Sequence, residues 1–110
     1  MRSEATKLGS IAAEAELFSK LVAENRAAES YTQNHPQYLQ KQASKELNQL
    51  SDQRAQPEVQ DALARLQDAC ERLNRVLSEL PKKSGDPRWN ESAREFYEIH
   101  HAVERLRREL

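Results

Sequence analysis

The stretch of the chain that decides the fold runs from Pro57 to Leu80 and reads PEVQDALARLQDACERLNRVLSEL. Its apolar residues recur at alternating steps of three and four, which is the period of one face of an α-helix. These positions are Val59, Ala62, Leu66, Ala69, Leu73, Val76 and Leu80, and a parallel column of Leu63, Cys70 and Leu77 widens the stripe. A stripe of this width predicts a helix that packs in the groove between two neighbouring helices.

The composition predicts a single domain, residues 1–110, built from long helices. Charged residues make up 32% of the chain, with only two glycines and four prolines. The formal net charge of −1 gives no cationic excess that would favour nucleic acid or an anionic membrane. The single cysteine excludes an internal disulfide, and no apolar run reaches the ~20 residues of a membrane span. We therefore expect a cytoplasmic protein.

Helical periodicity outside the central stretch predicts two further helices, over residues 3–32 and 87–109. The first carries an apolar stripe of Leu8, Ile11, Ala15, Phe18 and Val22, and the last carries Trp89, Phe96, Ile99, Val103 and Leu106. Asn34-His35-Pro36 predicts the first chain reversal, because proline disfavours helix at the residue before it. Asp86-Pro87 predicts the start of the last helix. The expected fold is all-α, an antiparallel up-down-up three-helix bundle that is monomeric.

The middle helix, residues 37–80, contains a break in its apolar phase. Leu50 and Val59 are nine residues apart, which places them on opposite sides of a straight helix at ~100° per residue. Pro57 lies at this break. Two interpretations satisfy the pattern: one long helix kinked near Pro57, or a helix that ends at Ser51-Asp52 followed by another that begins at Pro57. We favour the kinked helix, because Gln53-Arg54-Ala55-Gln56 contains no helix breaker.

The residues with the potential for chemistry do not predict an enzyme. Glu98 and His101 have the E-x-x-H spacing of di-iron bundles, but a second such motif is absent and His100 points ~100° away from His101. The acidic neighbours of Cys70 disfavour a reactive thiolate. Lys82 and Lys83 with Arg105, Arg107 and Arg108 form a basic end only if the loop and the C-terminus lie together. We expect no catalytic residue, no metal site and no cofactor.

Several residues resemble the tubulin-binding cofactor A family, a group of small three-helix bundles. The resemblance is carried by Lys7-Leu8-Gly9, Tyr38-Leu39-Gln40-Lys41-Gln42-Ala43, Pro57, Arg65-Leu66 and Arg75-Val76-Leu77. It implies a cytoplasmic, cytoskeleton-associated chaperone that binds β-tubulin during folding and heterodimer assembly. The alternative class is a non-catalytic helical adaptor or secretion-type chaperone that binds another protein.

A partner surface is predicted on the polar side of residues 38–54. We expect this surface to be polar, because an exposed apolar patch promotes aggregation of the free protein. Tyr38 and Arg54 are the first choices within it, since interfaces concentrate binding energy in tyrosine and arginine. The predicted surface consists of Tyr38, Lys41, Gln42, Lys45, Glu46 and Arg54.

Overall fold

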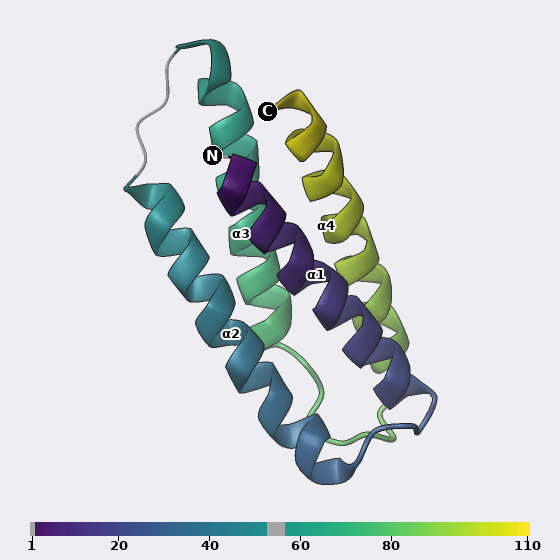
Figure 1. Ribbon diagram of the computed structural model, residues 1–110. Coiled ribbons are helices and arrows are strands. Elements are labelled where there is room, and N and C mark those ends of the chain that lie inside the picture. The colour runs from purple at the N-terminus through teal and green to yellow at the C-terminus, as the bar shows by residue number, and fades with distance from the viewer. Residues whose placement is uncertain (1, 53–56) are drawn as a thin grey trace.

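The computed structural model describes residues 2–52 and 57–110, and these residues fold into four α-helices (Figure 1). The helices are α1 (Arg2–Ala23), α2 (Glu29–Ser51), α3 (Gln60–Ser78) and α4 (Trp89–Glu109), with a 3-10 helix η1 (Pro57–Val59) ahead of α3. The described residues contain no β-strand. The predicted all-α class is confirmed, whereas the predicted three-helix bundle is wrong.

The four helices run alternately up and down in an elongated bundle of 46 × 21 × 18 Å. In Figure 1 the two termini lie at one end, and the α1–α2 and α3–α4 connections lie at the other. Neighbouring helices pack in the cyclic order α1, α2, α3, α4, and α1 also contacts α3 across the bundle. The closest packing joins α1 to α4, so the first and last helices of the chain form one side of the bundle.

The first chain reversal lies at residues 24–28 and not at Asn34-His35-Pro36 as predicted. Asn25 adopts a left-handed conformation with φ of 58°. Its N–H donates to the Val22 carbonyl, and the Arg26 N–H donates to the Leu21 carbonyl at 2.8 Å. This pattern of two backbone bonds around a left-handed residue is the Schellman motif that ends many helices. Asparagine tolerates the left-handed region, so α1 ends nine residues before the predicted Thr32.

Pro36 lies inside α2, although proline usually ends a helix. Contacts of the preceding turn compensate for it. The His35 ring stacks on Tyr31 with centroids 4.5 Å apart and meets the edge of Phe18 at 5.0 Å. Thr32 Oγ1 also donates to the Ala28 carbonyl at 3.1 Å. Tertiary packing therefore holds this turn in the helical conformation despite the missing backbone donor.

The middle of the chain forms two antiparallel helices in place of the predicted single helix over residues 37–80. Cys70 contacts Ala43 and Gln67 contacts Leu50, so residue numbers fall along α3 as they rise along α2. The alternative interpretation, a helix ending at Ser51-Asp52 and a new one starting at Pro57, has the correct boundaries. The predicted kink lies near residues 53–57, and residues 53–56 of that stretch lie outside the described residues. Pro57 occupies the first position of η1, where its missing N–H costs little.

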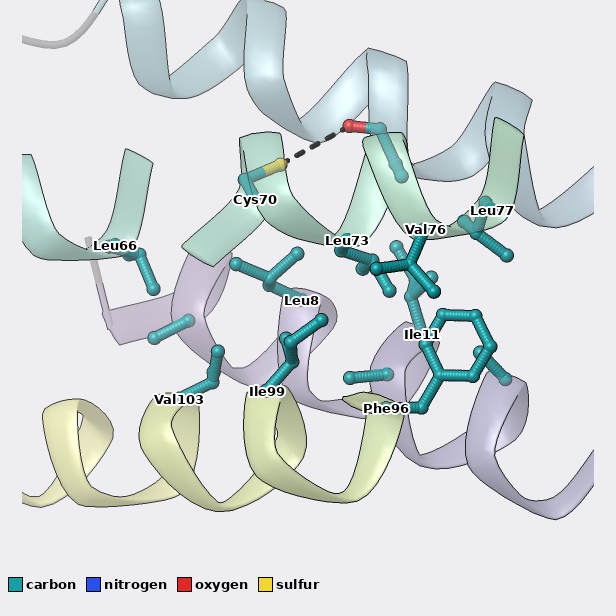
Figure 2. Packing of buried hydrophobic residues seen from close by; sticks show 14 of the residues in the cluster. Leu8, Ile11, Leu66, Cys70, Leu73, Val76, Leu77, Phe96, Ile99 and Val103 are labelled. Atoms are coloured by element: carbon teal, nitrogen blue, oxygen red, sulfur yellow. Dashed lines mark hydrogen bonds between the residues drawn. The ribbon is translucent and has the colours of Figure 1, made fainter. Parts of the chain in front are cut away.

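The core confirms the predicted apolar stripes. All five stripe residues of α1 are buried, as are Leu63, Leu66, Cys70, Leu73, Val76 and Leu77 of α3. Figure 2 shows α3 residues facing Leu8 and Ile11 of α1 and the row Phe96, Ile99 and Val103 of α4. Phe18 meets Trp89 edge to face at 5.6 Å, which forms a smaller cluster at the end that carries the α3–α4 loop.

The predicted loop after Leu80 and the start of the last helix are close to the observed ones. The Asp86 carboxylate accepts the Arg88 N–H at 2.9 Å, and α4 begins at Trp89, two residues after the predicted first position. The Trp89 indole donates to the Lys83 carbonyl at 2.8 Å and fixes the loop. At the other end, Gly9 is buried against α4, where an added Cβ would lie 3.1 Å from Glu104 Oε1.

Candidate functional site

A shallow groove lined by polar and cationic residues runs between α2 and α3. Its α2 wall consists of Gln37, Gln40, Lys41, Ser44, Lys45 and Asn48, and its α3 wall consists of Asn74, Arg75 and Ser78. Among the described residues that line this groove, three are cationic and none is acidic. This charge distribution is unlike that of the whole chain, whose formal net charge is −1. The groove is therefore a local cationic surface on a protein without cationic excess.

Three contacts between α2 and α3 fix the two walls of the groove relative to each other. Ser44 Oγ donates to Asn74 Oδ1 at 3.4 Å across the groove. Beneath it, Cys70 Sγ donates to the Ala43 carbonyl at 3.4 Å, the bond drawn dashed in Figure 2. Gln67 Nε2 donates to the Leu50 carbonyl at 2.8 Å near the end of α2. Small side chains at Ala43 and Cys70 permit this close approach, so the groove is shallow and firmly held.

The other side of α2 faces α1 and has a different chemical character. Tyr38, Gln42 and Glu46 line a small hollow there together with Lys7 and Glu14 of α1. Tyr38 is 52% exposed and stacks on His35 at 5.7 Å between ring centroids. The His35 Nε2 atom lies 3.2 Å from Glu14 Oε1. This side therefore combines an aromatic stack with carboxylates and contrasts with the cationic groove on the opposite side of α2.

Glu46 is buried, although the sequence interpretation places it on an exposed polar surface. Its side chain is only 5% exposed, and its Oε2 atom has no hydrogen-bond partner among the described residues. Burial raises the pKa of Glu46, and the charge of Lys7 opposes that shift only in part. Glu46 is three residues after Ala43 and four before Leu50, so it belongs to the buried column of α2. The spacing of Glu46 from Ala43 and Leu50 in the sequence already indicates that its side chain is buried.

The predicted partner surface is thus divided between the two sides of α2. Lys41 and Lys45 are exposed in the cationic groove, whereas Tyr38 and Gln42 lie toward α1. Arg54 lies outside the described residues. Sequence reasoning missed the α3 wall, which contributes Asn74, Arg75 and Ser78. Those three positions recur at helical spacing on the polar face of α3, but the sequence does not show that this face borders α2.

The other candidate residues engage separate partners. Burial raises the pKa of the Cys70 thiol to about 12, which disfavours a nucleophilic thiolate. His100 Nδ1 lies 3.2 Å from Glu16 Oε1, and the His101 ring packs on Tyr97 at 4.1 Å. Glu98 accepts a hydrogen bond from Arg72 at 2.8 Å. Over the described part of the chain, no group of three or more His, Cys, Asp or Glu side chains gathers as a metal site.

The lysines and arginines considered in the sequence do not form a basic patch at one end of the bundle. Lys82 and Lys83 belong to the α3–α4 loop, at one end of the bundle, whereas Arg105, Arg107 and Arg108 lie near the C-terminus at the opposite end (Figure 1). Arg107 also forms an ion pair with Glu104 at 2.9 Å on the same helix. These cations therefore make no joint surface, and the α2–α3 groove is the better candidate for electrostatic recognition.

None of the family models, curated proteins or solved structures compared with the chain matches it. In residues 2–52 and 57–110, no helix is long and apolar enough to cross a membrane.

Proposed function

We propose that this protein is a non-catalytic binding protein that engages a polypeptide partner along the groove between α2 and α3. The observation that carries the proposal is the concentration of Lys41, Lys45 and Arg75 in a groove whose described lining includes no acidic residue. Cations placed on a fixed, shallow surface favour recognition of a partner of opposite charge. The surrounding amides and hydroxyls supply donors and acceptors for a polypeptide backbone.

The chemistry of the groove supports binding and not catalysis. Its side chains are amines, amides, hydroxyls and one guanidinium, and its described lining includes no His, Asp or Glu side chain that could act as a general base. The buried thiol of Cys70 lies beneath the groove and donates to the Ala43 carbonyl. An extended surface on a small bundle is also a common basis for recognition of peptide segments.

β-Tubulin is the specific partner that the sequence resemblance suggests. In this form of the proposal the protein is a tubulin-folding cofactor of the cytoplasm, associated with the cytoskeleton. The resemblance includes Tyr38 to Ala43, and this stretch supplies Gln40 and Lys41 to the groove. The four-helix arrangement differs from the three-helix bundle of that family, so a helical adaptor or secretion-type chaperone remains the alternative within the same class of non-catalytic binding proteins.

Site-specific photocrosslinking tests both the binding face and the named partner. A photoreactive side chain at Ser44 lies within the groove, and the same group at Asn90, exposed on α4, serves as the matched control. Incubation with purified β-tubulin should give a crosslinked product from Ser44 and none from Asn90. Equal crosslinking from both positions would contradict the proposed face, and none from either would exclude β-tubulin.

A further inference from the structure

The cationic groove continues into a second hollow at the end nearer the α3–α4 loop, and the residues that line this second hollow include apolar ones. The two hollows share Gln37, Gln40 and Ser78. The second hollow has a volume of about 380 Å³ and includes apolar walls from Pro36, Leu77, Leu80 and Pro81. Its volume is within the range of ~300–1,000 Å³ of typical ligand pockets. We call it the anchor pocket.

Two prolines are among the residues that line the anchor pocket. Pro36 stands inside α2, and Pro81 follows the end of α3. Pro36 has no N–H, so the helical hydrogen bond that would normally occupy the Thr32 carbonyl cannot form. Thr32 and Pro36 both line the pocket.

The cations of the groove are arranged along a line that leads away from this pocket. Lys41 and Lys45 are one helical turn apart on α2, or ~6 Å along its axis. Arg75 is on the facing wall, and Lys82 is at the anchor pocket. None of the described residues that line either hollow is acidic. A ligand that fills both hollows therefore meets apolar side chains and one cation, Lys82, in the anchor pocket, and three further cations along the groove.

We infer that the groove binds an acidic polypeptide segment that carries an apolar residue at one end, with that residue in the anchor pocket and its carboxylates facing Lys41, Lys45 and Arg75. From Gln33 to Asn48 the α2 wall extends ~22 Å at 1.5 Å per residue. An extended segment of about seven residues spans that length. The inference rests on the proposed function, because it names the chemistry of the partner at the same groove.

A nucleic acid is the less suitable occupant of this site. Recognition of single strands relies on aromatic side chains on which bases stack, and the described lining of both hollows contains none. Recognition of duplexes relies on many phosphate contacts and a strongly cationic domain. The formal net charge of −1 and the small number of cations in the groove favour an acidic peptide with an apolar anchor.

Fluorescence polarisation with labelled synthetic peptides of about eight residues, a length suited to the groove, tests the inference. The acidic peptide has one terminal leucine followed by glutamates and serines. In three comparison peptides, serine replaces the leucine, glutamine replaces each glutamate, or lysine replaces each glutamate. A single-stranded oligonucleotide is the fifth probe. The acidic peptide with leucine should bind most tightly. Raising the salt concentration should weaken the binding of this peptide, because exposed charges are screened.

Two protein variants locate the contacts. Lys41→Gln with Lys45→Gln should reduce the affinity for the acidic peptide by about tenfold or more. Arg94→Gln with Arg108→Gln on α4 makes the same charge change and should leave that affinity unchanged. Gln33→Tyr places a ring at the edge of the anchor pocket. It should remove the advantage of the leucine peptide over the serine peptide, and Asn90→Tyr should preserve that advantage. Circular dichroism checks that each variant is folded.

The outcomes separate this inference from the proposed function. The inference would be overturned if the glutamine peptide bound as tightly as the acidic leucine peptide, or if the oligonucleotide bound more tightly than it. Failure of the acidic peptide to bind, while the Ser44 crosslink to a protein partner persists, would overturn the inference alone. Loss of both the peptide signal and the Ser44 crosslink would overturn the inference and also exclude β-tubulin as the partner. Tightest binding by the acidic leucine peptide, lost in the groove variants only, supports the inference.

Discussion

The Gln67 side chain of α3 donates a 2.8 Å hydrogen bond to the backbone carbonyl of Leu50, in the last turn of α2. Carbonyl groups in the last turn of a helix have no donor from the following turn, so a side chain from a neighbouring helix stabilises them. Together with the bond from Cys70 to the Ala43 carbonyl, this contact fixes the register of α3 against α2. The walls of the cationic groove depend on that register.

Gln67→Ala should reduce the free energy of unfolding by about 0.5–1.5 kcal/mol, because it removes one partly buried hydrogen bond. Chemical denaturation monitored by circular dichroism measures the loss. Gln37→Ala, an exposed glutamine of α2, is the control and should change stability by less than ~0.5 kcal/mol. Equal stability of the two variants would show that the Gln67 contact does not hold the α2–α3 pair together.

Leu66→Ala and Leu73→Ala should each reduce the free energy of unfolding by about 2–5 kcal/mol. Both side chains are fully buried between neighbouring helices, and their truncation leaves a cavity. Leu17 of α1 is 59% exposed, so Leu17→Ala serves as the control with little expected loss. Urea denaturation measures all three. Losses below ~1 kcal/mol for both core variants would mean that the α3 stripe does not face the core.

The two helix-associated prolines should respond differently to replacement. Pro36→Ala restores a backbone donor within α2 and should stabilise the protein, by at most the ~3 kcal/mol that an interior proline costs. Pro57→Ala should have little effect, because Pro57 is the first residue of η1 and needs no helical donor there. Thermal denaturation of the two variants measures the difference. If Pro57→Ala raised the stability of the protein more than Pro36→Ala does, this result would contradict the separation of α2 and α3 into two helices.

Glu46→Gln should stabilise the protein at neutral pH and have little effect near pH 4. Burial raises the folded-state pKa of Glu46 above its unfolded value of about 4.5. Below the unfolded pKa the carboxyl group is neutral in both states. As the pH rises through the raised folded-state pKa, the folded state must ionise a buried group and loses stability relative to the unfolded state. Denaturation midpoints at pH 7 and pH 4 measure the effect.

Glu16→Gln is the control, and we expect it to change the stability at pH 7 in the opposite direction from Glu46→Gln. Burial disfavours its ionisation, but hydrogen bonds from Lys20 and His100 outweigh burial and lower its pKa. Glu16→Gln should therefore destabilise the protein at pH 7, and that loss should disappear as the pH falls through the lowered folded-state pKa. If Glu46→Gln destabilised the protein at pH 7 as Glu16→Gln does, the buried, unpaired environment assigned to Glu46 would be wrong.

The sequence predicts the fold best where the apolar period is regular. The α3 stripe, the loop after Leu80 and the row Trp89, Phe96 and Val103 of α4 follow directly from spacing. The first turn was misplaced because Asn25 ends α1 through a left-handed conformation, which leaves only a weak signal in composition. Pro36 is a strong local breaker, yet α2 continues through it. The His35 ring stacks on Tyr31 of the same helix and meets Phe18 of α1 edge-on, and the contact with α1 cannot be read from a single helix.

The candidate site was predictable only in part. Lys41 and Lys45 follow from the polar spacing of α2, and both line the groove. Which side of a helix meets which neighbour depends on the number of helices, and the predicted count was wrong. For that reason Tyr38 was grouped with Lys41, although the structure places Tyr38 against α1, and Arg75 of the facing wall was not included.

The central claim is that the α2–α3 groove recognises the charge of its polypeptide partner, and reversing that charge tests it most directly. Calorimetric titration compares the acidic and lysine-containing peptides against the native protein, Lys41→Glu/Lys45→Glu, and the α4 control Arg94→Glu/Arg108→Glu. We predict that the groove variant loses affinity for the acidic peptide by at least about tenfold and gains affinity for the lysine peptide, whereas the α4 control behaves like the native protein. Unchanged affinity of the groove variant for the acidic peptide, or an equal loss in the α4 control, would contradict the claim.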